Sequence, residues 1–314
     1  VDAASANPGA NLSLKASGNL AGEPLMWDFA GDVKHLDLHA LGLSDTVAEI
    51  AAALTGKASF VPAVAATRRT PGRPMQVEAD VDLNDLYVHM GVDEIRGNDI
   101  ALNFNTRDSL TTARMDNRSL ALRFSSPAAL DTILSRFTSV GGVLTRGLAN
   151  RRLDIDSLQQ ALPQFDITLQ SGRGNVLSSI LADRGIMVDT LSLAAMNDSL
   201  ISARAQVLGI KSGSLVADTV TASLQQRGAY LLYDVVMDNR PGTFDQFAHV
   251  SAKGYLSGNY LSLIFKQQDI KDETGFSLGL MAQINDSSTV TLRFVPYHPI
   301  IGYKDWEINK DNFV

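Results

Sequence analysis

The stretch PMQVEADVDL, residues 74–83, alternates apolar and polar side chains without interruption. Its apolar positions are Met75, Val77, Ala79, Val81 and Leu83, and its polar positions are Gln76, Glu78, Asp80 and Asp82. A period of two places successive side chains on opposite faces of a β-strand. The stretch therefore predicts a strand with one apolar face and one polar face.

The same alternation recurs along most of the chain. In the clearest runs the apolar positions are Ile100, Leu102 and Phe104; Leu120, Leu122 and Phe124; Phe165, Ile167 and Leu169; Leu261, Leu263 and Phe265; Phe276, Leu278 and Leu280; and Val290, Leu292 and Phe294. Turn-forming stretches such as NTRDS, MDNRS and LSGN separate these runs at intervals of about 10–15 residues. We therefore predict a mainly β fold, a long curved antiparallel β-sheet with a few short helices.

Helical periodicity occurs in only a few places. One apolar stripe contains Val47, Ile50 and Leu54, and a longer one runs from Leu130 to Leu148. The chain is therefore expected to comprise an N-terminal β-repeat segment over 1–125, with one helix at about 44–56, a helical insert or lid over 126–184, and a C-terminal β segment over 185–314.

Composition excludes several classes of function. The 314 residues include no cysteine, which excludes thiol catalysis and disulfides, and the net charge of −7 comes without a long basic run, so no nucleic-acid partner is expected. No stretch approaches about 18 uninterrupted apolar residues, so no membrane-spanning segment is expected. The opening residues VDAASANPGANLSL lack the features of a signal peptide, and both termini are expected to be cuts inside a longer protein.

Catalytic and metal-binding patterns are weak. In VKHLDLHAL, residues 33–41, a strand would place His35, Asp37 and His39 on one face, which is a conceivable set of metal ligands. Leu36, Leu38 and Ala40 alternate with them, so the trio is better explained as a solvent face. No G-x-S-x-G nucleophile motif is present. We expect no enzymatic activity, no catalytic residues, no metal and no cofactor.

The apolar face raises the question of what covers it. A dozen or more strands carry more apolar face than a few short helices can cover, so the sheet must fold over on itself or be filled by something else. The pattern alone favours a plain packed β core. A curved sheet lined by Leu, Ile, Val, Ala and Phe can also hold acyl chains.

A family resemblance supports the second interpretation. The segment from about residue 185 to 314 resembles a central segment of TamB-like proteins of the AsmA-like superfamily. Three features carry it: the strand VTLRFVPYHPII (290–301), the line GYKDWEINKDNFV (302–314) that looks like the opening of a following repeat, and the strand pair GTFDQF (242–247) and GYLSGNYLSL (254–263). GDVKHLDLHALGL (31–43) and NDLYVHMGVDEIRGNDIALNF (84–104) look like looser repeats, so the resemblance is weaker over the rest of the chain.

The resemblance implies a fold and a function. Such proteins are similar to long periplasmic rods, anchored in the inner membrane, that reach an outer-membrane barrel protein of the Omp85 type. Their sheet forms an open, taco-like apolar trough, and they are implicated in phospholipid transport and in assembly of outer-membrane proteins. Phospholipid acyl chains would then be the partner of this chain, in the periplasm, and the chain would have been cut between two trough segments.

Trough-lining residues follow from the alternation. We expect the lining to comprise Leu102, Phe104, Leu120, Leu122, Phe124, Leu263, Phe265, Leu278, Leu280, Leu292 and Phe294. Two alternatives remain open at this point. One is a non-enzymatic β-repeat scaffold or adhesin-like protein with a closed core, and the other is a metal-dependent enzyme using His35, Asp37 and His39.

Overall fold

The computed structural model describes residues 2–309 apart from positions 8, 20, 23, 41–48, 68–70, 91–92, 97–98, 108, 244 and 286–288. The chain divides into two compact units. Unit 1 comprises Val1–Ile133 and Ile167–Arg184, and unit 2 comprises Leu134–Asp166 and Gly185–Val314. This division differs from the three predicted segments, because the helices of 126–184 are distributed over both units.

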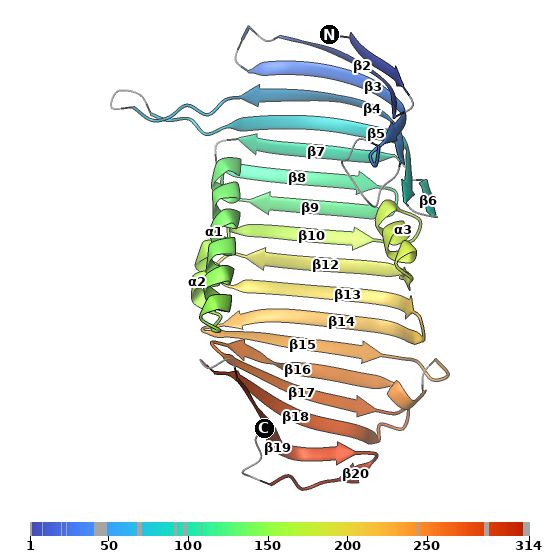
Figure 1. The fold of residues 1–314 in the computed structure, drawn as a ribbon, viewed down its shortest axis with the longest axis vertical. Coiled ribbons are helices and arrows are strands. Elements are labelled where there is room, and N and C mark those ends of the chain that lie inside the picture. Colours follow the sequence, from blue (N-terminus) through green and yellow to red (C-terminus); the bar gives the residue numbers. More distant parts are fainter. Residues whose placement is uncertain are drawn as a thin grey trace. The chain divides into compact units, whose positions relative to one another are not determined.

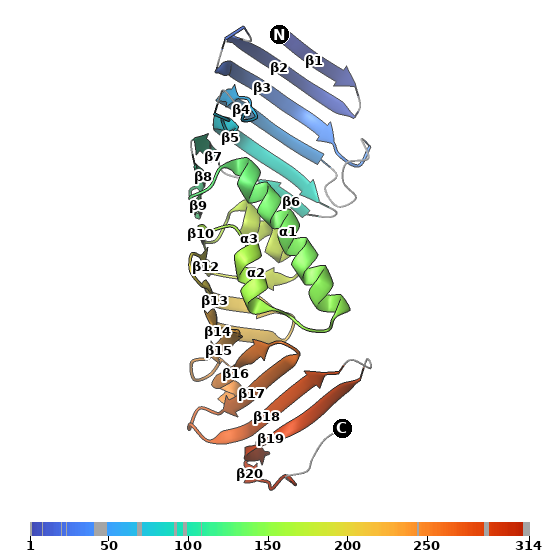
Figure 2. The same cartoon turned by 90° about the vertical axis from the view of Figure 1, so that its left-hand side faces the viewer.

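Unit 1 is an antiparallel sheet with one helix beside it (Figures 1 and 2). Its elements are β1 (Asp2–Asn7), β2 (Ala10–Asn19), β3 (Leu25–Asp37), β4 (Glu49–Val61), β5 (Gln76–Met90), β6 (Asp93–Arg96), β7 (Ile100–Arg107), β8 (Leu110–Asn117), β9 (Leu120–Ser126), β10 (Phe165–Ser171) and α3 (Val176–Asp183). Strand β10 belongs to unit 1 from Ile167 onward. Strands β1 to β5 pair in order, β5 pairs with both β6 and β7, and β7 to β10 continue the series.

Unit 2 repeats this organisation. Its elements are α1 (Leu130–Ala149), α2 (Ile155–Ala161), β11 (Ile186–Met187), β12 (Thr190–Asn197), β13 (Ile201–Ser212), β14 (Leu215–Arg227), β15 (Tyr230–Asp238), the 3₁₀ turn η1 (Asp245–Phe247), β16 (His249–Ser257), β17 (Tyr260–Gln268), β18 (Thr274–Ile284), β19 (Val290–Ile301) and β20 (Lys304–Asp305). Helix α1 belongs to unit 2 from Leu134 onward. Strands β11 and β12 both pair with β13, and β13 to β20 form an antiparallel meander.

The predicted fold class is confirmed. Strands dominate the described residues, the strand pairs described above are antiparallel, and the α-helices there are α1, α2 and α3. Residues 76–83 of the alternating stretch PMQVEADVDL lie in β5, and the predicted strand at 165–170 is β10. None of the helices in the described part of the chain is both long enough and apolar enough to cross a membrane.

The predicted helix at 44–56 is wrong over its described part. Residues 44–48 lie outside the described residues, and from Glu49 onward the chain forms β4. Backbone pairing on both sides explains the difference, since Leu54 is paired with Gly31 of β3 and with Leu83 of β5. A run of alanines has high helix propensity, but such propensity is a weak bias that tertiary pairing overrides.

Local capping defines the short helices. Asp154 caps α2 by accepting a 3.0 Å hydrogen bond from the Ser157 backbone N–H. Asn175 caps α3 in a reciprocal arrangement with Ser178. These caps satisfy backbone N–H groups that would otherwise lack a partner in the first turn of each helix.

Close packing in the middle of unit 2 depends on one glycine. Gly254 in β16 is paired with Tyr233 of β15 and Leu263 of β17. The Tyr233 hydroxyl donates a 2.7 Å hydrogen bond to the Ser262 carbonyl oxygen, so its side chain reaches past Gly254 to the next strand. A Cβ atom at Gly254 would overlap the Ser262 carbonyl oxygen and approach the Tyr233 hydroxyl.

We therefore predict that Gly254→Ala destabilises the fold by about 1–3 kcal/mol, because the added methyl group forces the strands apart. Chemical denaturation followed by circular dichroism measures this change. Gly141→Ala is the matched control, since a Cβ there meets nothing within 4 Å and alanine favours the helix. Equal stability of the two variants would contradict this packing.

Candidate functional site

Strand register places the predicted lining residues of unit 1 on one face. Directly opposed residues of antiparallel strands point to the same side of a sheet. Leu102 is opposite Met115, which is opposite Leu122, and Phe104 is opposite Ala113, which is opposite Phe124. Towards the N-terminus the face continues through Val81, Gly56, Phe29 and Ala16, and through Ala79, Ala58, Trp27 and Gly18.

The reverse face of unit 1 is polar. Asp80 is opposite Lys57 and Asn103, and Arg114 is opposite Arg123. The strands paired with β5 therefore also keep apolar side chains on one face and polar side chains on the other. Unit 1 has one apolar and one polar face.

Unit 2 separates its side chains in the same way. Leu263 is opposite Leu280, which is opposite Phe294, and Phe265 is opposite Leu278. Leu292 joins the same face opposite Ala282. The face continues over β15 and β14 through residue pairs such as Val235 with Ala222 and Met237 with Val220. The lining residues predicted in each unit therefore share one face of that unit.

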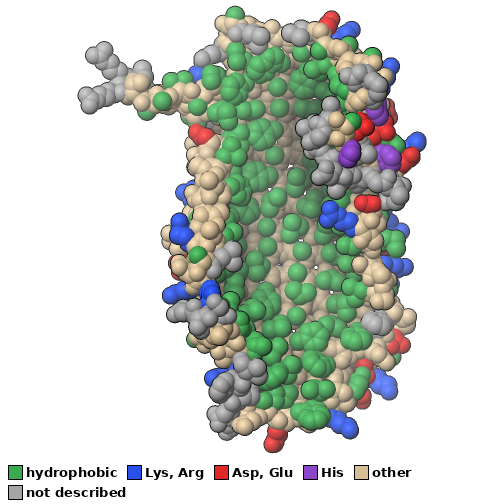
Figure 3. Space-filling view, in the orientation of Figure 1, with side chains coloured by type: hydrophobic (Ala, Val, Ile, Leu, Met, Phe, Trp, Pro, Cys, Tyr) green, Lys and Arg blue, Asp and Glu red, His purple; other side chains and the backbone are tan. Residues whose placement is uncertain are grey.

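Within the described residues, no second layer covers these apolar faces. Figure 3 shows hydrophobic side chains gathered over the hollowed face of each unit, with most charged groups toward the edges. Leu292 is 45% exposed and Phe294 is 37% exposed, whereas Leu120 is only 4% exposed. The other predicted lining residues are half-buried, because neighbouring side chains on the same face cover part of their surface. Among the described residues, the buried hydrophobic ones are Ala52, Ile100, Leu120, Ile133, Ile155 and Ala217.

Total surface area leads to the same conclusion. The accessible surface of the chain is 19246 Å². A compact protein of 33.8 kDa is expected to expose about 12,700 Å², and two separate compact domains of half that mass about 15,000 Å² together. The excess surface is what uncovered sheet faces produce. A packed β core, which the sequence pattern alone favours, does not account for it.

Helix α2 and its flanking residues run along one edge of the sheet in unit 2 (Figures 1 and 2). The Leu153 backbone N–H donates to the Gly258 carbonyl oxygen at the β16–β17 turn, at 2.9 Å. Asn197, at the end of β12, donates to the carbonyl oxygen of Pro163, also at 2.9 Å. Gln226, at the end of β14, donates to the Asp156 carboxylate. The segment therefore links successive hairpin ends along this edge.

Helix α1 is held beside α2 and keeps much of its apolar stripe exposed. Arg136 donates to the carbonyl oxygens of Gln160 and Leu162, at 2.8 and 3.4 Å. Leu134, Phe137 and Leu144 are 57%, 49% and 40% exposed. A role for 126–184 as a lid over the apolar face stays a prediction.

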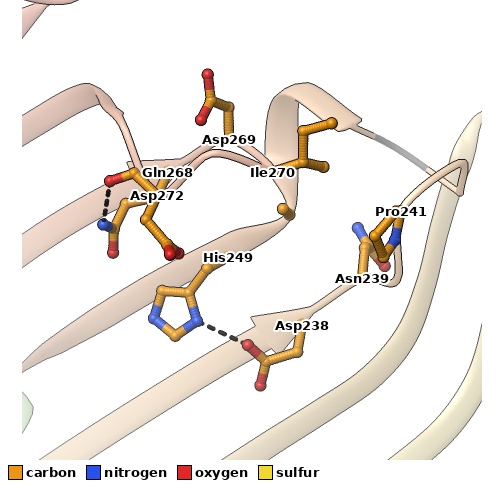
Figure 4. A pocket seen from close by; sticks show the side chains of 9 residues that line it. Asp238, Asn239, Pro241, His249, Gln268, Asp269, Ile270 and Asp272 are labelled. Carbon is orange, nitrogen blue, oxygen red and sulfur yellow. Dashed lines mark hydrogen bonds and ion pairs between the residues drawn. The ribbon is translucent and has the colours of Figure 1, made fainter.

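The opposite edge of unit 2 holds a polar cavity of about 430 Å³ between the β15–β16 and β17–β18 loops (Figure 4). His249 Nδ1 lies 2.6 Å from a carboxylate oxygen of Asp238, and Gln268 donates to the Asp272 carbonyl oxygen. Burial acts to raise the pKa of Asp269, but backbone hydrogen bonds from Lys271 and Glu273 outweigh it and lower that pKa. This edge presents negative charge. No sequence signal indicated the cavity, because its residues come from separate loops.

His35, Asp37 and His39, the conceivable metal-ligand trio of the alternative interpretation, do not assemble on one strand face. β3 ends at Asp37, His39 lies in the following turn, and the register shifts between Val33 and Leu36. His35 Nδ1 instead lies 2.6 Å from the Glu49 carboxylate. Across the described residues no group of three His, Cys, Asp or Glu side chains is arranged to hold a metal ion.

Comparisons with known proteins identify no relative. No family model matches the chain, and no curated protein and no solved structure matches it.

Exposure of the apolar face predicts how substitutions affect stability. Leu292→Ser should change the free energy of unfolding by no more than about 1 kcal/mol, because its side chain already contacts water. Leu120→Ser, at a buried position of the unit 1 face, should cost about 2–5 kcal/mol. Urea denaturation of both variants measures the difference. A large loss for Leu292→Ser would mean that its face is packed.

Acid stability should reflect Asp218, whose pKa is lowered to about 2 by hydrogen bonds from the Arg240 side chain and backbone. Its usual pKa is 3.8, so this ion pair stabilises the folded protein above about pH 4, and the contribution is lost as the pH falls from 4 to 2. Thermal unfolding at pH 6 and pH 2.5 should show a smaller acid-induced loss for Arg240→Gln than for the original chain. Equal losses would contradict the assignment.

Proposed function

We propose that the apolar faces of this protein bind the acyl chains of phospholipids, and that the chain is a non-enzymatic segment of a lipid-transfer protein. The observation that carries the proposal is the apolar face of each unit, which no described element covers. On this face Leu292 and Phe294 of unit 2 are exposed, and Leu102, Phe104, Leu122 and Phe124 of unit 1 are partly exposed. An apolar surface this extended, bordered by polar edges, is typical of a ligand or partner site.

Partition supplies the physical mechanism. Moving a hydrocarbon chain from water to an apolar surface is favourable by about 0.8 kcal/mol per buried CH₂ group. The face needs no specific hydrogen bond to hold such a chain, and the polar headgroup stays in water. Such binding is tolerant of chain length, so a lipid can move from one position on a face to the next without crossing a large barrier.

The resemblance to TamB-like proteins supports the wider setting. On that basis the chain is part of a longer periplasmic protein that supports lipid transport and outer-membrane protein assembly. Its partners would be phospholipids and, through the full-length protein, an outer-membrane barrel of the Omp85 type. The fold supports this proposal because a one-sided antiparallel sheet is what an apolar trough requires.

A scaffold or adhesin with a closed core accounts less well for the observations. A closed core buries most of its large apolar side chains. In unit 2, Leu261, Val290 and Leu292 are all at least 44% exposed although they lie on the same apolar face. The excess accessible surface also favours a face that is open to a ligand.

Photo-crosslinking tests the proposal residue by residue. A benzophenone amino acid at Leu122 or Leu292 should capture phospholipid from cells that express the chain, because both positions lie on the apolar faces. The same group at Arg123 or Arg293, one residue along each strand, should capture little, because it points to the polar side. Mass spectrometry of the crosslinked protein identifies the captured molecule. Equal capture at neighbouring positions, or none at all, would overturn the proposed function.

A further inference from the structure

The two edges of the unit 2 sheet carry opposite charge. In an antiparallel meander, successive hairpin turns alternate between the two ends of the strands. The turns β12–β13, β14–β15, β16–β17 and β18–β19 therefore lie at one edge, and β15–β16 and β17–β18 at the other. The segment around α1 and α2 follows the first edge, and the cavity of Figure 4 lies at the second.

The first edge carries a cluster of arginines, which is followed by Asp154 and Asp156 at the start of α2 and faces Asp198 in the β12–β13 turn. Residues 132–153 contain Arg136, Arg146, Arg151 and Arg152 and none of the 34 acidic residues of the chain. We name these four residues the arginine edge. Arg151 donates a 3.2 Å hydrogen bond to the Asn285 carbonyl oxygen after β18, and an ideal Cβ atom at Gly258 in the β16–β17 turn would lie 3.6 Å from Arg152 Nε. The arginine edge thus borders the turns from which β17 and β19 begin.

The second edge is acidic. Asp238, Asp269, Asp272 and Glu273 lie in or beside its two loops. We name them the carboxylate edge. Two basic residues lie in the same region. Arg240 donates a 3.0 Å hydrogen bond to Asp218, which largely compensates its charge, and Lys271 lies between Asp269 and Asp272, so the four carboxylates outnumber the remaining basic charge. A phosphate group is therefore repelled at this edge and attracted at the other one.

The arginine edge also presents hydrocarbon. Leu134, Phe137 and Leu144 form an exposed apolar stripe on α1, the helix that contributes Arg136 and Arg146. A guanidinium group binds phosphate oxygens with planar, paired donors, and the stripe can contact the first carbons of an acyl chain. A phospholipid has these two chemistries side by side.

We propose that the arginine edge of unit 2 is the headgroup site of the bound lipid, which selects phosphate-bearing lipids and holds each headgroup on the α1 side. This inference depends on the proposed function, because the tails must occupy the apolar face for the phosphate to reach the edge. The protein would then bind an anionic glycerophospholipid in preference to an uncharged lipid with the same acyl chains.

The test uses a competition between two lipids. The chain with a benzophenone amino acid at Leu292 is incubated with dioleoylphosphatidylcholine vesicles that contain equal amounts of dioleoylphosphatidylglycerol and dioleoylglycerol. Both added lipids have the same acyl chains, so a difference in capture at Leu292 reports on the headgroup alone. The ratio of captured phosphatidylglycerol to diacylglycerol is measured by mass spectrometry.

The expected ratio clearly favours phosphatidylglycerol and falls about two- to tenfold in the Arg146→Gln, Arg152→Gln variant, since exposed charge pairs are individually weak. Arg136 is kept, because it links α1 to α2. The control is Arg204→Gln, Arg293→Gln, which changes the net charge equally on the polar face. Equal capture of the two lipids, or equal losses in variant and control, overturns the headgroup site alone. Capture of neither lipid overturns the proposed function as well.

Discussion

Backbone hydrogen bonding between antiparallel strands is the interaction on which each unit depends. Where no second layer covers a sheet within the described residues, contacts between side chains on the same face must replace a packed core. The rings of Phe265 and Phe276 meet edge to face, with centroids 5.6 Å apart. The Tyr233 hydroxyl reaches the backbone of β17 across Gly254. Such lateral contacts give aromatic and branched residues a structural role while one side of each remains exposed.

This arrangement has a cost that a ligand can remove. Exposing apolar surface to water is unfavourable by about 25 cal/mol per Å². Binding of an apolar ligand to an extended exposed face is therefore favourable. A hydrocarbon chain covers the apolar surface without needing directional contacts such as hydrogen bonds. The polar face and the charged edges stay in water. Binding and stability are then coupled, because a lipid that covers the face stabilises the folded state.

The sequence predicts the faces well because β periodicity is local. Alternation alone places Leu102, Phe104, Leu122 and Leu263 on their faces, and the registers agree. It fails at 49–56, where an alanine-rich run has a helical period but lies between two strands. It could not predict the cavity near Asp238 and His249, because loop positions far apart in sequence meet only in the fold. The arginines of 132–153 are visible in the sequence, but their place along one edge is not.

Whether hydrocarbon chains occupy the apolar faces is tested most directly with a brominated lipid. Crystals of the chain grown with a phospholipid that has brominated acyl chains would locate the tails by anomalous scattering. We expect bromine peaks over the Leu102 and Leu122 face of unit 1 and over the Leu263 and Leu280 face of unit 2. Peaks confined to the polar faces, or apolar side chains that close on one another and leave no space for a tail, would contradict it.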